Sequence, residues 1–320
     1  MVDPKENSMS DKKIYLLPKT GNLYKANLHC HSTVSDGSFT PEELKKMYME
    51  KGYHAIAYTD HRACVPHTEL TDSGFVALTG IENAFGIGRG TSVHICGISR
   101  DPLKCFDRPD VADDGNDSIN RGIRLLSDDN FITTLNHPRW SGISAHNISL
   151  LDRVDNIEIV NGYEMIQDGY GNSSAIYELE LRRGRRAMPI ATDDSHRTKG
   201  ERQAGHEYFR GFTMLTCGAL TYDSLIGALD SGSFFASTGP ILSELWLDGN
   251  TLHIECSPVS GIYVHGSLYK HRAAVIEDED TIRCIDIDLG NIFADSDYIF
   301  VQAVDTKGNR AWSVPYWFNR

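Results

Sequence analysis

Two histidines stand one residue apart in a short segment, 27–36 (NLHCHSTVSD), at the end of a predicted strand. Side chains alternate between the two faces of a β-strand, so we expect His29 and His31 to point the same way. Leu28 and Cys30 would then point the opposite way, into packing. Two neutral imidazoles on one face suit a divalent metal ion, and a surface pair is the alternative. The fold must therefore bring further ligands to this segment from elsewhere in the chain.

Length, charge and cysteine content limit the class of protein. A chain of 320 residues predicts one large domain and a smaller one. The formal net charge of −13 argues against a long nucleic-acid partner, which would need a basic stripe. No apolar run is long enough to cross a membrane, and the seven cysteines contain no C-x-x-C pair, which predicts reduced thiols in a cytoplasmic protein. Residues 1–13 are polar, and we expect a disordered leader there.

Predicted strands and helices alternate over residues 14–240. Thr40-Pro41-Glu42-Glu43 marks a helix start, with Thr40 as N-cap and Glu43 completing a capping box. The strands are expected at 14–17, 24–31, 54–59, 75–79, 91–98, 131–135, 156–160, 188–191 and 212–217, and the helices at 41–51, 119–127, 149–154, 173–183 and 222–231. This alternation predicts an α/β fold with a parallel sheet and helical crossovers.

The texture of the sequence changes after Gly239-Pro240. Residues 241–320 contain short alternating β runs at 243–247, 251–256, 262–265, 281–287 and 298–304. Turn signals such as Asp248-Gly249-Asn250 separate these runs. The pattern predicts a second domain that is a small all-β sandwich.

Histidines and acidic residues recur near the ends of the predicted strands in the first domain. In a parallel α/β barrel the carboxyl ends of the strands form one rim, so we expect these side chains to share one pocket. The nine candidate metal ligands are His29, His31, Asp36, His61, Glu82, His94, His137, Asp194 and His196.

These residues lie in an ordered series of motifs that resembles the PHP (polymerase and histidinol phosphatase) superfamily. The motifs are His29-x-His31, Asp36, Thr59-Asp60-His61, Gly80-Ile81-Glu82, His94, Asn136-His137-Pro138 and Asp194-x-His196. The resemblance covers about residues 24–240 and implies a distorted (β/α)7 barrel with a trinuclear metal centre. Residues 233–240 (SFFASTGP) and the β domain ending in Arg310-Ala311-Trp312 resemble a carbaryl-hydrolase-like branch with a C-terminal β domain.

The resemblance also implies how the ligands divide among two or three divalent ions. The first ion would take His29, His31 and Asp194; the second Glu82, shared with the first, His94 and His137; and the third Asp36, His61 and His196. The family often has histidine where Asp36 stands, which makes the third site more anionic here. Imidazole and carboxylate ligands suit Zn, Mn or Fe equally well. We expect Glu82, Asp194 and His196 to be catalytic as well as metal-binding.

Metal ions held close together share a water molecule and lower its pKa, which generates hydroxide. The predicted activity is therefore hydrolysis of a small phosphomonoester or phosphodiester by a metal-bridging hydroxide that attacks phosphorus in line. Two alternatives stay open: a carbamate, amide or aryl-ester hydrolase with the same metal centre, and a non-catalytic metal-containing binding protein. The expected partner is thus a small phosphorylated or ester substrate, with no membrane involved.

Four residues beside the ligand motifs are candidates for substrate binding. Arg62, Arg139 and Arg197 follow ligand motifs closely, and a guanidinium group matches the geometry of phosphate oxygens. Asn161 follows a predicted strand and is the fourth candidate.

Overall fold

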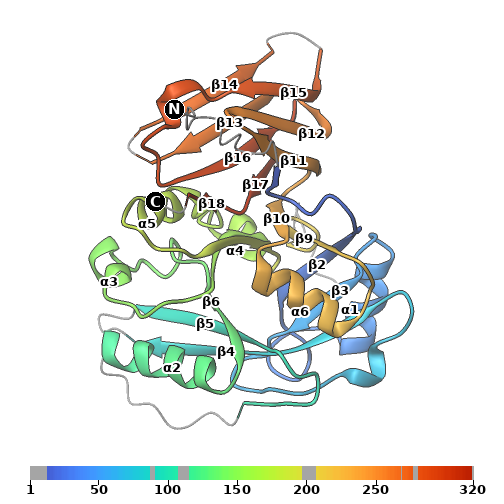
Figure 1. The fold of residues 1–320 in the computed structure, drawn as a ribbon. Coiled ribbons are helices and arrows are strands. Elements are labelled where there is room, and N and C mark those ends of the chain that lie inside the picture. Colours follow the sequence, from blue (N-terminus) through green and yellow to red (C-terminus); the bar gives the residue numbers. More distant parts are fainter. Residues whose placement is uncertain are drawn as a thin grey trace, which may run out of the picture.

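The computed structural model describes residues 13–86, 91–106, 115–196, 207–267, 269–276 and 280–318. Figure 1 shows a mixed α/β region, with the C-terminal strands stacked at one end of the molecule. Among the described helices, none has the length and apolar character needed to cross a membrane.

A mixed sheet runs through most of the chain in the order β14-β13-β16-β17-β10-β9-β2-β3-β4-β5-β6-β7-β8, and β18 pairs with β16. Its first strands along the chain are β2 (Asn22–Cys30), β3 (Ala55–Tyr58), β4 (Val76–Gly86), β5 (Ser92–Ser99), β6 (Phe131–Leu135), β7 (Asn156–Asn161) and β8 (Met188–Thr192). The later ones are β9 (Phe212–Cys217), β10 (Phe234–Ser237), β13 (Gly261–Gly266), β14 (His271–Val275), β16 (Tyr298–Val304), β17 (Arg310–Ser313) and β18 (Tyr316–Trp317).

The predicted α/β class is confirmed, whereas the distorted (β/α)7 barrel that the motifs implied is not confirmed, because the sheet is mixed and no closed barrel is detected among the described residues. β4 pairs with β5, and β5 with β6, in antiparallel fashion. β4 ends at Gly86 and β5 begins at Ser92, which leaves too few residues for the helical crossover that a parallel pair requires. Within the described residues, no continuous ladder joins β8 to β2; an isolated parallel bridge links Cys30 to Ser195.

The described helices are α1 (Pro41–Met49), α2 (Asn116–Asp128), α3 (Ala145–Ser149), α4 (Gly162–Gln167), α5 (Ser174–Arg182) and α6 (Tyr222–Ser231). The capping box predicted for α1 is present, with Thr40 and Glu43 bonded in both directions. The helix predicted at 149–154 is wrong, because Ser144 caps a helix that ends at Ser149. The short helix α4 was not predicted, and it begins where the Asn161 side chain accepts a hydrogen bond from the Glu164 amide.

The C-terminal region contains two sheets with a common core. The second sheet has the order β1-β11-β12-β15, formed by β1 (Ile14–Tyr15), β11 (Leu242–Asp248), β12 (Thr251–Val259) and β15 (Ile282–Asp288). Leu245 and Ile254 from this sheet share one buried cluster with Val264 and Val301 from the mixed sheet. β1 pairs with β11, so the first described strand lies with the C-terminal strands.

Two sequence segments that together resemble one branch of the family lie side by side, 233–240 and 310–312. β10 pairs with β17 in antiparallel register, with Ala236 opposite Trp312. β10 also pairs with β9, so this seam continues the sheet from the α/β region into the C-terminal strands.

Candidate metal centre

The end of β2 positions His29 and His31. The pairing of β2 with β3 shifts register between Asn27 and Cys30, and such irregularities re-aim side chains. Leu28 and Cys30 are both buried in apolar packing, Cys30 in one cluster and Leu28 in another. His29 and His31 are both buried, and their Nε2 atoms lie 3.2 Å apart.

The most buried group of donors joins this pair to Glu82 and Asp194. Asp194 Oδ1 lies 3.1 Å from Nε2 of His29 and 3.1 Å from Nε2 of His31. Glu82 places Oε1 3.2 Å from His29 Nε2 and Oε2 3.3 Å from His31 Nε2. One donor atom from each of these four residues lies within 4.8 Å of the other three.

Glu82 also faces three further imidazoles. Its Oε2 lies 2.9 Å from Nδ1 of His61, and its Oε1 lies 3.1 Å from Nδ1 of His94. His137 is more distant, with Nε2 3.6 Å from Glu82 Oε1 and 3.9 Å from Asp194 Oδ2. Glu82 is therefore central to the cluster, and His61 lies beside it as closely as His94 does.

A looser group surrounds Asp36. This carboxylate is 57% exposed and lies 3.7 Å from a ring nitrogen of each of three histidines, His31, His61 and His196. The structure thus brings all nine predicted ligands into one connected cluster, which is tightest around Glu82 and most open around Asp36.

Glu158 is a buried residue of this site that was not predicted from the sequence. One of its oxygens lies 2.9 Å from His29 Nδ1, and the other accepts from the His137 backbone N–H at 2.7 Å and from Asn161 Nδ2 at 2.9 Å. Hydrogen bonds of this kind fix the tautomer and orientation of a metal-ligating histidine. A glutamate between Ile157 and Ile159 in a buried strand was the available signal.

Two further buried carboxylates hold the loops that carry the ligands. Asp60 accepts from the Ser32 amide at 2.7 Å and from the Ser35 hydroxyl at 2.7 Å, which fixes the segment after His31. Asp193 accepts from the Tyr48 hydroxyl at 2.9 Å and from several backbone N–H groups of residues 209–211. These contacts fix the backbone on both sides of the cluster.

Three residues at the site have a left-handed backbone conformation. The φ angles are 57° for Arg62, 25° for His137 and 51° for Asp194. Non-glycine residues pay a free-energy cost there, and such strain persists where the surrounding structure enforces it. At His137 and Asp194, the enforced strain directs a candidate ligand into the cluster.

The electrostatics of the cluster favour positive charge. Burial opposes protonation of His31, yet hydrogen bonds to Asp194 and Glu82 raise its pKa to about 9. Burial likewise opposes protonation of His29, but Asp194 and other nearby acidic groups raise its pKa well above its usual value. In contrast, burial and the nearby His31 lower the pKa of His196 to about 4. The carboxylates that stabilise protonated imidazoles here would stabilise a bound cation in the same way.

The donor set fits divalent metal ions. Oε2 of Glu82 and Oδ1 of Asp194 are buried, and among the described residues they face no hydrogen-bond donor other than the imidazoles of the candidate ligands. Leaving a buried carboxylate oxygen unpaired is costly, whereas coordination to a cation would satisfy it. Imidazole nitrogens and carboxylate oxygens are the usual ligands of Zn and related metals.

The residues predicted to bind substrate lie in different surroundings. The Arg62 side chain is exposed, while its backbone N–H donates to the Glu82 carbonyl at 2.9 Å. Arg139 is exposed, and its guanidinium lies near the Asn172 carbonyl and over the Tyr170 ring. Arg197 lies outside the described residues.

Asn161, the fourth candidate for substrate binding, is hydrogen-bonded within the site. It is buried, and its amide nitrogen donates to Glu158 and, at 2.9 Å, to Asp194 Oδ2. Its amide oxygen accepts from the Glu164 backbone at the start of α4. Asn161 thus orients Asp194, and its polar atoms are already engaged.

Trp140 lies at the rim of the cluster. It is 37% exposed, and its ring lies 4.8 Å from that of His137.

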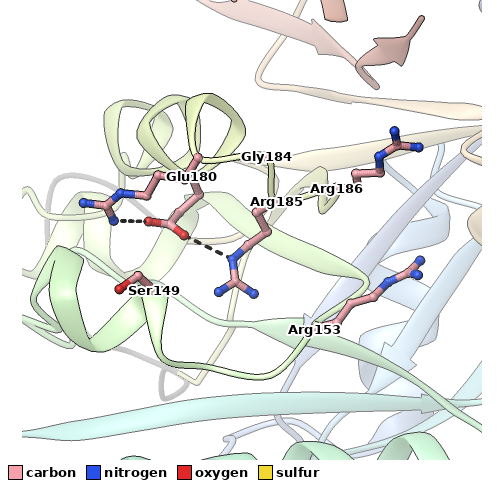
Figure 2. A pocket seen from close by; sticks show the side chains of 7 residues that line it. Ser149, Arg153, Glu180, Gly184, Arg185 and Arg186 are labelled. Carbon is pink, nitrogen blue, oxygen red and sulfur yellow. Dashed lines mark hydrogen bonds and ion pairs between the residues drawn. The ribbon is translucent and has the colours of Figure 1, made fainter. Parts of the chain in front are cut away.

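A separate arginine-rich pocket of about 590 Å³ lies at the end of α5. The buried Glu180 is bonded on two sides, by Arg183 at 2.6 Å and by Arg185 at 3.1 Å. Figure 2 shows the bond between Glu180 and Arg185. Arg185 also donates to the carbonyls of Ile148 and Leu151. Arg185 therefore connects Glu180 of α5 to Ile148 and Leu151. The pocket shares no residue with the nine-ligand cluster.

Comparison with curated proteins gives two short matches, and no family profile matches the chain. A 5'-3' exoribonuclease from Haemophilus influenzae is 35% identical over 81 residues, which cover 24% of this chain and 29% of that protein. A phosphoribosyl 1,2-cyclic phosphate 1,2-diphosphodiesterase from Eggerthella lenta is 35% identical over 77 residues, covering 22% of this chain and 29% of that protein. The match thus spans less than a third of either relative.

Three solved structures match this chain with TM-scores below 0.5. A two-domain protein from Bacteroides vulgatus with a predicted PHP-like metal-dependent phosphoesterase matches over 95% of this chain and 97% of its own, at 14% identity and a TM-score of 0.48. A candidate metal-dependent phosphoesterase from Bifidobacterium adolescentis covers 59% of this chain and 92% of its own, at 15% identity and a TM-score of 0.42. An amidohydrolase from Chromobacterium violaceum covers 65% and 96%, at 16% identity and a TM-score of 0.42.

A cluster of imidazoles and carboxylates such as this one is typical of metal-dependent hydrolases. Within that class, the ordered motifs in the sequence resemble those of the PHP superfamily.

Proposed function

We propose that the chain is a metal-dependent phosphoesterase that hydrolyses a small phosphomonoester or phosphodiester. The observation that carries the proposal is the cluster of nine candidate ligands, in which two buried carboxylate oxygens face no hydrogen-bond donor among the described residues other than the candidate histidines. The two short sequence matches, to an exoribonuclease and a diphosphodiesterase, support phosphate-ester chemistry.

The chain's own residues would bind and orient the metal ions. His29, His31 and Asp194 would hold one ion, and Glu82 would connect it to a second. Divalent ions at these positions would supply an activated water and neutralise charge that develops on the substrate's oxygens. We propose two or three ions of Zn, Mn or Fe, the third on the more exposed side at Asp36.

The surroundings of the cluster suit a small substrate. Trp140 stands at its rim with a ring available for packing against an organic group. Arg62 and Arg139 extend from segments beside the ligands, and movement of either guanidinium toward the cluster would place it on a phosphate group. The cytoplasmic location expected from the sequence stays a prediction.

A second candidate is hydrolysis of a carbamate, amide or aryl ester. Cation-activated water can also attack a carbonyl carbon, so the same ligands would serve. The resemblance to the carbaryl-hydrolase-like branch favours this alternative, through the paired segments of β10 and β17.

The test compares chromogenic substrates on metal-depleted protein after addition of Zn, Mn or Fe. The proposal predicts turnover of p-nitrophenyl phosphate or bis-p-nitrophenyl phosphate that exceeds turnover of p-nitrophenyl acetate. Turnover of the acetate alone would support the ester hydrolase, and no turnover with the metal sites filled would support a binding protein.

Glu82→Gln and His29→Ala are the matched variants. Both remove a donor from the most buried group, so each is expected to lose bound metal and activity together. Metal content per chain is measured in parallel with activity. Retained phosphoesterase activity in His29→Ala, with loss of metal demonstrated, would contradict the proposed mechanism.

A further inference from the structure

A second group of metal-ligating side chains lies on the outer face of the C-terminal sheet β1-β11-β12-β15. His253 is opposite Asp286 across β12 and β15, and Glu255 is opposite Cys284 in the same ladder. The intervening residues Leu252 and Ile254 point into the buried core, because side chains alternate between the faces of a strand. The register therefore gathers an imidazole, two carboxylates and a thiol on one face.

The imidazole of His253 is held in a defined orientation. Its Nδ1 lies 2.6 Å from Oδ1 of Asp286, and Trp246 stacks on its ring with centroids 4.3 Å apart and planes 13° apart. A carboxylate at Nδ1 places the proton there and leaves a lone pair on Nε2. That Nε2 faces Glu255, at 3.5 Å from Oε1.

We propose that His253, Glu255 and Cys284 bind a divalent ion of the borderline to soft class, such as Zn²⁺. One donor atom from each of the three lies within 4.8 Å of the other two. Imidazole, carboxylate and thiolate together are typical zinc ligands, and water completes the coordination of a three-ligand site. Binding releases the thiol proton to solvent as the Cys284 sulfur–metal bond forms.

This site differs from the candidate metal centre in residues and in chemistry. None of its side chains belongs to the nine-ligand cluster, and its sulfur ligand makes it selective for softer ions. Asp286 acts as a positioning residue that orients His253, in the way that carboxylates orient histidines in other metal sites.

The test measures alkylation of Cys284 by iodoacetamide in the full-length protein, with and without a molar excess of zinc. The modified peptide is quantified by mass spectrometry, so metal bound at the other centre does not affect the readout. Because Cys284 is exposed, we expect alkylation without metal, and zinc is expected to slow this modification strongly. Cys217, which is partly exposed in β9, provides an internal control whose rate stays unchanged.

Two variants separate a built site from a reactive thiol. His253→Gln is expected to abolish the protection by zinc, and Asp286→Asn to weaken zinc affinity by about tenfold to a hundredfold. Melting temperatures establish that both variants are folded. Unchanged alkylation of wild-type Cys284 in excess zinc, or equal protection in His253→Gln, would overturn the proposal; wild-type affinity in Asp286→Asn would overturn the role given to Asp286.

Discussion

Replacing Glu158 with glutamine tests whether the candidate metal centre depends on residues behind the ligands. The substitution preserves the size of the side chain but turns one acceptor oxygen into an NH₂ donor. Glu158 accepts from four donors at once: His29, the His137 amide, Asn161 and the Thr192 hydroxyl. At least one of these donors must then face another donor, so the variant disturbs His29 or the backbone of His137.

The expected loss follows from the position of Glu158. Removal of a hydrogen-bond partner behind a metal-ligating histidine typically weakens metal affinity by about 10-fold to 100-fold. That range corresponds to about 1.4 to 2.8 kcal/mol of binding free energy. Because Glu158 contacts both His29 and the segment of His137, the loss should lie toward the upper end of the range.

The assay is calorimetric titration of Zn²⁺ or Mn²⁺ into metal-depleted protein, with melting temperature measured on the same samples. Glu180→Gln is the matched control, since Glu180 is also a buried glutamate with two strong partners, Arg183 and Arg185, outside the site. The control should lower the melting temperature and leave metal affinity unchanged. Wild-type affinity in Glu158→Gln, or an equal loss in both variants, would refute the reasoning.

Two other perturbations have defined outcomes. In Gly37→Ala the new Cβ would lie 2.2 Å from the carbonyl oxygen of His31, so we expect loss of bound metal and of thermal stability. Gly218→Ala is the control, because no atom lies within 4 Å of its new Cβ. It should match wild type in metal content and in melting temperature. His265 stacks on Phe300, and burial lowers the pKa of its imidazole. As the pH falls through about 6.5, the unfolded chain therefore binds a proton at this residue more readily than the folded chain does. The free energy of unfolding consequently decreases. His265→Phe should therefore show a smaller fall in melting temperature between about pH 7 and pH 5 than wild type, and an equal fall would contradict this assignment.

Local sequence signals predicted several helices and strands well. The capping box before α1 depends only on neighbouring residues, and β6, β9, α6 and β16 begin and end where their patterns predicted. Pairing direction depends on partners far away in the sequence, so the antiparallel pairs around β5 were missed. For the same reason the hydrogen bond from Asn161 to Asp194 was not predicted, because Asp194 lies 33 residues further along the chain.

The three buried carboxylates behind the ligands lead to a prediction about metal removal. Asp60, Glu158 and Asp193 each bind several donors from the loops that carry the ligands, and these bonds involve no metal. The protein should therefore keep its near-UV circular dichroism in EDTA at room temperature.

Metal should nevertheless add stability by mass action, about 2.7 kcal/mol when the free ion is at 100 times its Kd. EDTA is then expected to lower the melting temperature while the unfolding transition stays cooperative. Loss of the near-UV signal in EDTA before heating would show that the site becomes ordered only when metal binds. The proposal that Asp60, Glu158 and Asp193 order the site without metal would then be wrong.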